Sequence, residues 1–185
     1  MKSKKTLVIN ADDFGFNKEI SDGIVECFTR GCLTSTTLMA HMPAAEYAVE
    51  QAKGLPDLSV GVHLSLCTGR PVAPSSQIPS ITASDGGFLT APEMMRRAQR
   101  GKLLTKDIEV EFSAQIERLI ELGVSPSHLD SHHNIGVYPQ PFFALLRVAK
   151  KYNIRRMRTY RGWFRVPSDE HLGCMQLAKA NVKRA

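Results

Sequence analysis

Short apolar segments rich in β-branched residues alternate along this chain with longer segments of helical periodicity. This alternation predicts that strands and helices follow one another in turn. Gly31 and Gly54 provide natural stops after the first two helical segments. The predicted strands are residues 6–10, 34–39, 58–66, 128–131 and 156–160, and the predicted helices are residues 18–30, 44–53, 92–100, 105–122 and 141–151.

Strands that are separated by helices of this length imply βαβ units and a mainly parallel sheet, so the predicted fold class is α/β. The pattern alone does not distinguish a closed barrel from an open sheet. With 185 residues, the chain is expected to form one domain (residues 1–185) that buries roughly 70% of its unfolded surface. Residues 67–87 contain three prolines and are expected to form a long loop without regular structure.

The composition is that of a globular protein, with 43% hydrophobic and 23% charged residues. The sequence has no apolar run of about 18 residues, so stable membrane insertion is not expected. The basic first residues lead through a short apolar run into two aspartates, which predicts a strand and not a signal peptide. The four cysteines form no Cys-x-x-Cys pair, which favours reduced thiols and a cytoplasmic location.

The net charge of +6 is unevenly distributed, because residues 131–168 contain no acidic residue and carry eight lysines and arginines with aromatic residues among them. One interpretation is a surface for phosphate, nucleic acid or an anionic lipid head group, and the other is a solvated helix face and loop. The solvated face is favoured, and no nucleic-acid partner is expected, because no nucleic-acid-binding motif accompanies the charge.

Candidate metal ligands lie at the ends of three predicted strands. Asp12 and Asp13 come directly after the first strand, and His63 closes an apolar run in the third. Because the carboxyl ends of parallel strands meet at one edge or face, we expect these groups to lie close together. The last group contains His128, Asp130, His132 and His133.

Each group also has a structural interpretation. One of the two aspartates is a candidate cap for the following helix, because Asp is favoured at that position. His63 taken alone is more often a hydrogen-bonded core residue. Residues 128–133 favour a metal site more strongly, because three histidines and an aspartate are costly to bury without partners. His41 and His171 have no such neighbours and are predicted to be structural or surface residues.

A mixed set of aspartate and histidine suits Zn²⁺, Ni²⁺, Co²⁺ or Mn²⁺ and is less natural for Mg²⁺, which prefers oxygen ligands. Such a site polarises a carbonyl group and lowers the pKa of a bound water. A neighbouring free carboxylate can then take the proton of that water. The chemistry therefore predicts hydrolysis of an amide or an ester.

Three motifs occur in order along the chain, namely Asn-Ala-Asp-Asp-Phe-Gly at residues 10–15, Gly-Val-His-Leu at 61–64 and His-Leu-Asp-Ser-His-His at 128–133. Together with Thr-Ser-Thr-Thr at residues 34–37, they resemble the YdjC-like carbohydrate deacetylases. The resemblance implies a TIM-like (β/α) barrel with fewer than eight strands and a homodimer. It also implies a divalent metal ion, described as Mg²⁺ or Zn²⁺, and removal of acetyl groups from N-acetylated sugars.

The resemblance also implies roles for individual residues. Asp13, His63 and His132 match metal ligands, and Asp12 matches the general base that activates water. His128 and His133 match motif positions near the metal, Arg158 resembles an arginine of a later strand that contacts substrate, and Asp130 is a candidate to orient an imidazole. In the mechanism that we expect, His128 is the acid that protonates the departing amine and His133 contacts the substrate.

Members of this family are longer, and their last part carries a further histidine-containing segment close to the site. Neither His171 nor residues 175–185 match that segment, so the barrel is expected to be incomplete at its C-terminal end. Two alternatives to a sugar deacetylase stay open. One is another metal-dependent hydrolase that acts on an anionic substrate, and the other is a catalytically inactive metal-binding protein.

Overall fold

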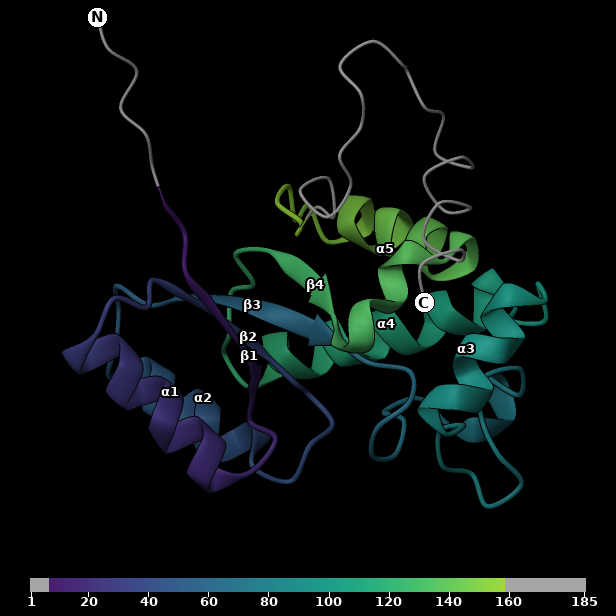
Figure 1. Cartoon of the computed structure of the whole chain (residues 1–185), viewed down its shortest axis with the longest axis horizontal. Helices are drawn as coiled ribbons and strands as arrows, with labels where there is room; N and C mark the ends of the chain where they lie inside the picture. Colours follow the sequence, from purple (N-terminus) through teal and green to yellow (C-terminus); the bar gives the residue numbers. More distant parts are fainter. Residues whose placement is uncertain (1–6, 159–185) are drawn as a thin grey trace, which may run out of the picture.

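The computed structural model describes residues 7–158, whose centre is a parallel sheet of four strands (Figure 1). Each strand pairs with the next one in the chain, so the order contains no reversal within these residues. A sequential order of this kind occurs in (β/α) barrels, whereas a doubly wound sheet reverses its order. The predicted α/β class is confirmed. The strands are β1 (Asn10–Phe14), β2 (Ser35–Leu38), β3 (Ser59–Leu64) and β4 (Leu129–Ser131).

Helices connect the successive strands and flank the sheet (Figure 1). In Figure 1, α1 and α2 lie together beside β1 and β2. The helix α4 packs against β3 and α5, on the other side of the sheet region from α1 and α2. No helix in the described part of the chain combines the length and hydropathy needed to span a membrane. The helices are α1 (Lys18–Arg30), α2 (Ala45–Lys53), η1 (Ser75–Gln77), α3 (Ala91–Gln99), α4 (Thr105–Glu121), η2 (His132–Val137) and α5 (Pro139–Lys151).

The first strand begins later than its apolar run predicts. Leu7 and Val8 precede it and are 76% and 66% exposed, whereas pairing with β2 starts at Ile9, whose carbonyl accepts from two backbone N–H groups of residues 34 and 35. The strand then continues through both aspartates. The prediction placed the strand by hydrophobicity, but the pairing with β2 decides where β1 begins.

The predicted strand at 156–160 is present as a single parallel bridge between Met157 and Leu129. The Arg158 N–H donates to the Leu129 carbonyl at 3.0 Å, which continues the sheet beyond β4. Residues 159–160 lie outside the described part of the chain, as do His171, the segment 175–185 and the basic residues after Arg158.

The apolar stripe of α4 forms a large part of the core. Ile108, Phe112, Ile116 and Leu119 are fully buried, and burying each such side chain is worth about 1.5–3 kcal/mol. Ile120, which also follows the predicted stripe, is 45% exposed because it lies one position further round the helix. The stripe packs α4 against β3, the strand that carries the first candidate histidine.

The loop at residues 67–87 is irregular, as predicted, apart from η1, but it is firmly anchored. Two of its own side chains, Ile78 and Ile81, are fully buried. The buried Glu111 carboxylate of α4 accepts from the N–H groups of Val72 and Ala73 at 3.1 and 2.9 Å, and burial raises its pKa. Its hydrogen bonds therefore fix the loop that follows β3.

Candidate metal centre

A bulge in β1 brings two neighbouring aspartates to the same site. The register with β2 shifts between Ala11 and Phe14, and Asp13 has a φ of 66°. On a regular strand, neighbouring side chains point to opposite faces, so both carboxylates reach one site only because the chain is distorted here. A left-handed conformation of a residue other than glycine costs roughly 1–3 kcal/mol and is typical of functional sites.

Neither aspartate caps α1. The Asn17 carboxamide oxygen accepts from the Ile20 N–H at 2.7 Å and supplies the cap. The structural alternative for the aspartate pair is therefore wrong, and both carboxylates are available to the site.

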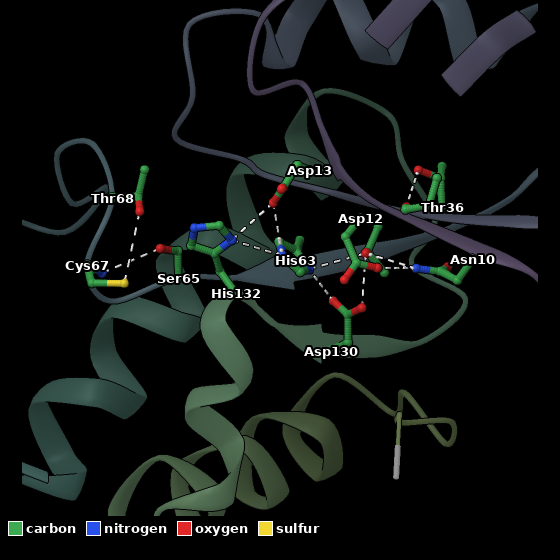
Figure 2. Close-up of polar contacts among 12 residues, drawn as sticks. Asn10, Asp12, Asp13, Thr36, His63, Ser65, Cys67, Thr68, Asp130 and His132 are labelled. Carbon is green, nitrogen blue, oxygen red and sulfur yellow. Dashed lines mark hydrogen bonds and ion pairs between the residues drawn. The ribbon is translucent and has the colours of Figure 1, made fainter. Parts of the chain in front are cut away.

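Asp13, His63 and His132 meet at the carboxyl ends of β1, β3 and β4, and we call them the metal triad (Figure 2). The Asp13 Oδ1 atom lies 3.2 Å from His63 Nε2 and 3.0 Å from His132 Nδ1. The two imidazole nitrogens are 3.3 Å apart. The sequence-based expectation that these three side chains come together is met by the geometry.

The triad fits a divalent cation. Ligands held at about 2.0–2.1 Å from a tetrahedral or octahedral ion are separated by about 2.8–3.4 Å, a range that contains the three observed distances. Asp13 Oδ1 is buried and has no hydrogen-bond partner of normal geometry among the described residues. A buried carboxylate oxygen that faces two imidazole nitrogens is thus best satisfied by a shared cation.

Electrostatics at the triad favour a negative carboxylate beside a positive partner. The close imidazoles of His132 and His63 hold the pKa of Asp13 well below its usual range, against the opposing effect of burial. Burial acts to lower the pKa of His63, but its contacts with Asp13 and Asp130 raise it to about 9. The contacts of His63 with the two carboxylates therefore favour its protonated form when no cation is bound.

Asp130 supports His63 from the side opposite to the triad. Its Oδ1 lies 2.5 Å from His63 Nδ1, and its Oδ2 accepts from the Thr37 hydroxyl at 3.0 Å. Asp130 and His63 are both buried and are direct partners in the β3–β4 register. A carboxylate on one ring nitrogen fixes the ring and leaves the other nitrogen for a metal. This is the orienting position predicted for Asp130.

Asp12 lies beside the triad (Figure 2). It is held by Arg158. Arg158 donates to both Asp12 oxygens, at 2.5 and 2.7 Å, and also contacts Asp130 Oδ2 at 3.1 Å. Burial acts to raise the pKa of Asp12, but the hydrogen bonds and charge of Arg158 outweigh it and leave the pKa below its usual value. Asp12 is therefore an ionised carboxylate that is separate from the triad.

The chain turns sharply after His132, because His133 and Asn134 both have left-handed backbones, with φ values of 52° and 53°. His132 contacts Asp13 and His63, whereas His133 is exposed, and the centroids of the two neighbouring rings are 4.1 Å apart. Burial, and then the nearby charge of His132, lower the pKa of His133. His133 thus lies on the outer side of the triad.

His128 lies before β4, two residues ahead of Asp130, and its ring nitrogens face serines. Nδ1 is 2.8 Å from the Ser127 hydroxyl and Nε2 is 3.4 Å from the Ser35 hydroxyl. Six of the predicted site residues, the triad included, thus form one cluster, while His128 occupies a neighbouring position on the sheet. They are Asp12, Asp13, His63, Asp130, His132 and Arg158.

Sequence reasoning missed Asn10 and Thr37. Asn10 Nδ2 donates to Asp12 Oδ1 at 2.8 Å, and Thr37 contacts both His63 Nδ1 and Asp130. Side chains two residues apart on a strand lie on the same face, so the sequence could have indicated that Asn10 lies beside Asp12. Ser35 and Thr37 share a face of β2 for the same reason.

His41 was predicted to be a structural or surface residue. Its Nε2 lies 2.8 Å from the Thr68 carbonyl, and burial lowers its pKa to about 4.

The described fold and cluster define an α/β protein with an Asp-His-His metal-type site at the ends of parallel strands. Comparison with known families makes this more specific. The family described as YdjC-like protein matches residues 6–184, and the chain belongs to that family. The resemblance seen in the three sequence motifs is thereby confirmed.

Individual relatives agree with this assignment. The chain is 44% identical over 156 residues to a carbohydrate deacetylase from Geobacillus stearothermophilus, covering 83% of this chain and 60% of the relative. It is 39% identical over 148 residues to a carbohydrate deacetylase from Clostridium beijerinckii, covering 80% and 58%. The chain thus matches about 60% of the length of these relatives.

A solved structure also matches the fold. It is a protein from Enterococcus faecalis described as a cellobiose-phosphate cleavage protein, with a TM-score of 0.80 and 31% sequence identity. The match covers 96% of this chain and 66% of the other.

Proposed function

We propose that this protein acts as a metal-dependent hydrolase that removes acetyl groups from N-acetylated sugars of the chito-oligosaccharide type or related glycoconjugates. One observation carries the proposal, namely the metal triad with its ligand atoms within 3.3 Å of one another beside the separate carboxylate of Asp12. Curated relatives at 44% and 39% identity, both named carbohydrate deacetylase, support the choice of substrate.

The proposed architecture is a TIM-like barrel with fewer than eight strands. The sequential strand order and the bridge from β4 to Met157 support it, because each added parallel strand continues the same winding. A homodimer is part of the proposal by resemblance to the family, and the molecular mass in solution tests it.

The proposed cofactor is a divalent cation held by Asp13, His63 and His132. Two imidazole nitrogens and one carboxylate suit Zn²⁺ better than Mg²⁺, because Mg²⁺ prefers oxygen ligands. When bound, such an ion polarises a carbonyl group and lowers the pKa of a water.

Asp12 is the proposed general base. Ionised at neutral pH, it accepts a proton from the water that attacks the acetamide carbon. Its lowered pKa makes the protonated form a good acid, so Asp12 can return that proton to the departing nitrogen. Acetate and a free amine are then the products. His128 as a separate acid remains a sequence-based prediction.

Arg158 is proposed to position Asp12. It donates a hydrogen bond to each oxygen of the Asp12 carboxylate. A bidentate pair of this kind fixes the orientation of the carboxylate and also stabilises its negative charge. A substrate contact, as predicted for both Arg158 and His133, is compatible with the partial exposure of Arg158 and the exposure of His133.

The basic surface on α5 is partly neutralised. Arg147 pairs with Glu109 at 3.1 Å, and Lys151 pairs with Glu117 at 3.3 Å. These pairs support the solvated-face interpretation and give the alternative of an anionic substrate no specific advantage.

The test is an assay of acetate release from N-acetylglucosamine oligomers after metal removal and reloading with Zn²⁺, Mg²⁺ or Mn²⁺, with phosphoesters as a parallel panel. The proposal expects acetate release that needs the added metal. Phosphoester hydrolysis without acetate release would instead favour the anionic-substrate alternative, and metal binding without turnover of either panel would favour an inactive metal-binding protein.

A further inference from the structure

His128 and Gly61 fit together on the inner part of the sheet. The carbonyl of His128 accepts from the Val62 N–H at 3.0 Å, which puts His128 opposite Gly61 on β3. A Cβ atom on Gly61 would lie 2.6 Å from His128 Cε1 and Nδ1 and 2.7 Å from Nε2. The imidazole therefore occupies the space of a side chain on β3, and it can do so only because residue 61 has none.

Lying over Gly61, the ring reaches across β3 towards β2. Its Nε2 is 3.4 Å from the Ser35 hydroxyl, whose own hydrogen goes to Asn10 Oδ1 at 2.7 Å. Asn10 Nδ2 then donates to Asp12 Oδ1 at 2.8 Å. A continuous series of contacts thus joins His128, the residue before β4, to the proposed base Asp12 on β1.

Chemistry fixes the direction of these hydrogen bonds. An ionised carboxylate only accepts, so the Asn10 amide nitrogen must face Asp12 and its oxygen must face Ser35. Ser35 therefore donates to Asn10 and can accept only from a protonated Nε2 of His128. With Nε2 protonated, Nδ1 of a neutral ring is an acceptor that lies 2.8 Å from the Ser127 hydroxyl. The Ser127 oxygen also lies 2.8 Å from the Val60 carbonyl, so the single hydroxyl hydrogen is shared between these two acceptors.

We infer that His128, Ser35 and Asn10 are positioning residues that aim Asp12, and that Gly61 provides the space the imidazole needs. This inference rests on the proposed function only through the role of Asp12 as base. We call the three residues the His128–Asn10 chain. Arg158 holds Asp12 from one side and Asn10 holds it from the other, so the carboxylate is clamped between them. In this series of hydrogen bonds, His128 acts on the proposed base through Ser35 and Asn10, and it does not act as the acid for the leaving group.

The kinetic test uses His128→Ala, Ser35→Ala and the double variant. Each single change is expected to lower kcat by about 10-fold or more, as for other supports of catalytic groups, with KM and metal affinity unchanged. Because the residues act in series, the double variant is expected to lose no more than the worse single one. His128→Gln should recover most of the loss, because its amide N–H can still donate to Ser35.

A second readout does not depend on turnover. The side-chain amide signals of Asn10 in a ¹H–¹⁵N spectrum should shift in the same direction in His128→Ala and Ser35→Ala. Unchanged Asn10 signals, or kcat values equal to wild type in both variants, would overturn the inference. Asp12→Asn is the control for the proposed function, because retained turnover there removes Asp12 as base, whatever the spectra show.

The steric part is tested by a double-mutant cycle in thermal unfolding. Gly61→Ala alone should lower the unfolding midpoint, because the new methyl group meets the imidazole. In the His128→Ala background the same change should have no cost or raise the midpoint, since alanine is favoured over glycine within a strand. An equal loss in both backgrounds would contradict the packing of His128 over Gly61.

Discussion

His63 and His128 come from neighbouring positions on the same sheet, yet their surroundings differ completely. His63 lies at the end of β3 between Asp13 and Asp130, and its pKa is raised to about 9 against the effect of burial. His128 lies before β4 between Ser127 and Ser35, and burial lowers its pKa. A histidine is therefore not identified as a metal ligand by its residue type alone. Its position relative to the carboxyl end of the strand and the side chains that it contacts decide this.

The largest expected effect separates the metal triad from the His128–Asn10 chain. Asp13→Ala or His132→Ala should lower the affinity for divalent metal by more than about 100-fold and abolish turnover, because a direct ligand is removed. His128→Ala should leave metal affinity unchanged. Isothermal titration of Zn²⁺ into metal-free protein measures both, and weak binding in His128→Ala would break the distinction between the two histidines.

The next effect concerns the proposed base. Asp12→Asn should lower kcat by roughly 10²–10⁴-fold, the usual contribution of a general base, while metal affinity stays at the wild-type value. Stopped assays of acetate release, paired with the same titration, give the two numbers. Turnover close to wild type would show that Asp12 does not carry the proton.

A third prediction concerns Asp130, whose contact with His63 has no counterpart at His128. Asp130→Asn keeps the shape but removes the charge at His63 Nδ1, so metal affinity should fall by about 10–100-fold. Thr37→Val, which removes only a hydroxyl contact to the same pair, is the matched control with a smaller expected loss. Equal losses in the two variants would mean that packing and not charge orients the ring.

The smallest effects are opposite pH dependences of stability in the metal-free protein. Because the pKa of His63 is raised, its contacts contribute fully to the stability of the folded protein below pH 6.5. This contribution is lost as the pH rises through about 9. The lowered pKa of His128 means that protonation of the unfolded chain reduces stability as pH falls below 6.5.

Denaturant unfolding in the presence of a chelator measures these trends. The stability difference between wild type and His63→Gln should shrink from pH 6 towards pH 9.5, and His128→Gln should reduce the loss of stability on the acid side. The same slope in both variants would contradict the different environments of the two rings.

The fold and the triad follow from local sequence patterns. Alternating strands and helices predicted the parallel sheet, and the convergence of strand ends predicted that the acidic and histidine groups lie together. The resemblance to the family then singled out Asp13, His63 and His132 among them. The bulge at Asp13 could not be predicted, because its left-handed backbone depends on pairing with β2. The link from His128 to Asn10 was equally hidden, since it depends on the missing side chain of Gly61 across the sheet.

The most direct test of the metal triad is a crystal structure with Zn²⁺ or Mn²⁺, located by anomalous scattering. The account predicts one peak bonded to Asp13 Oδ1, His63 Nε2 and His132 Nδ1, at about 2.0–2.2 Å from each. A peak held by other side chains, with these three atoms uninvolved, would contradict it.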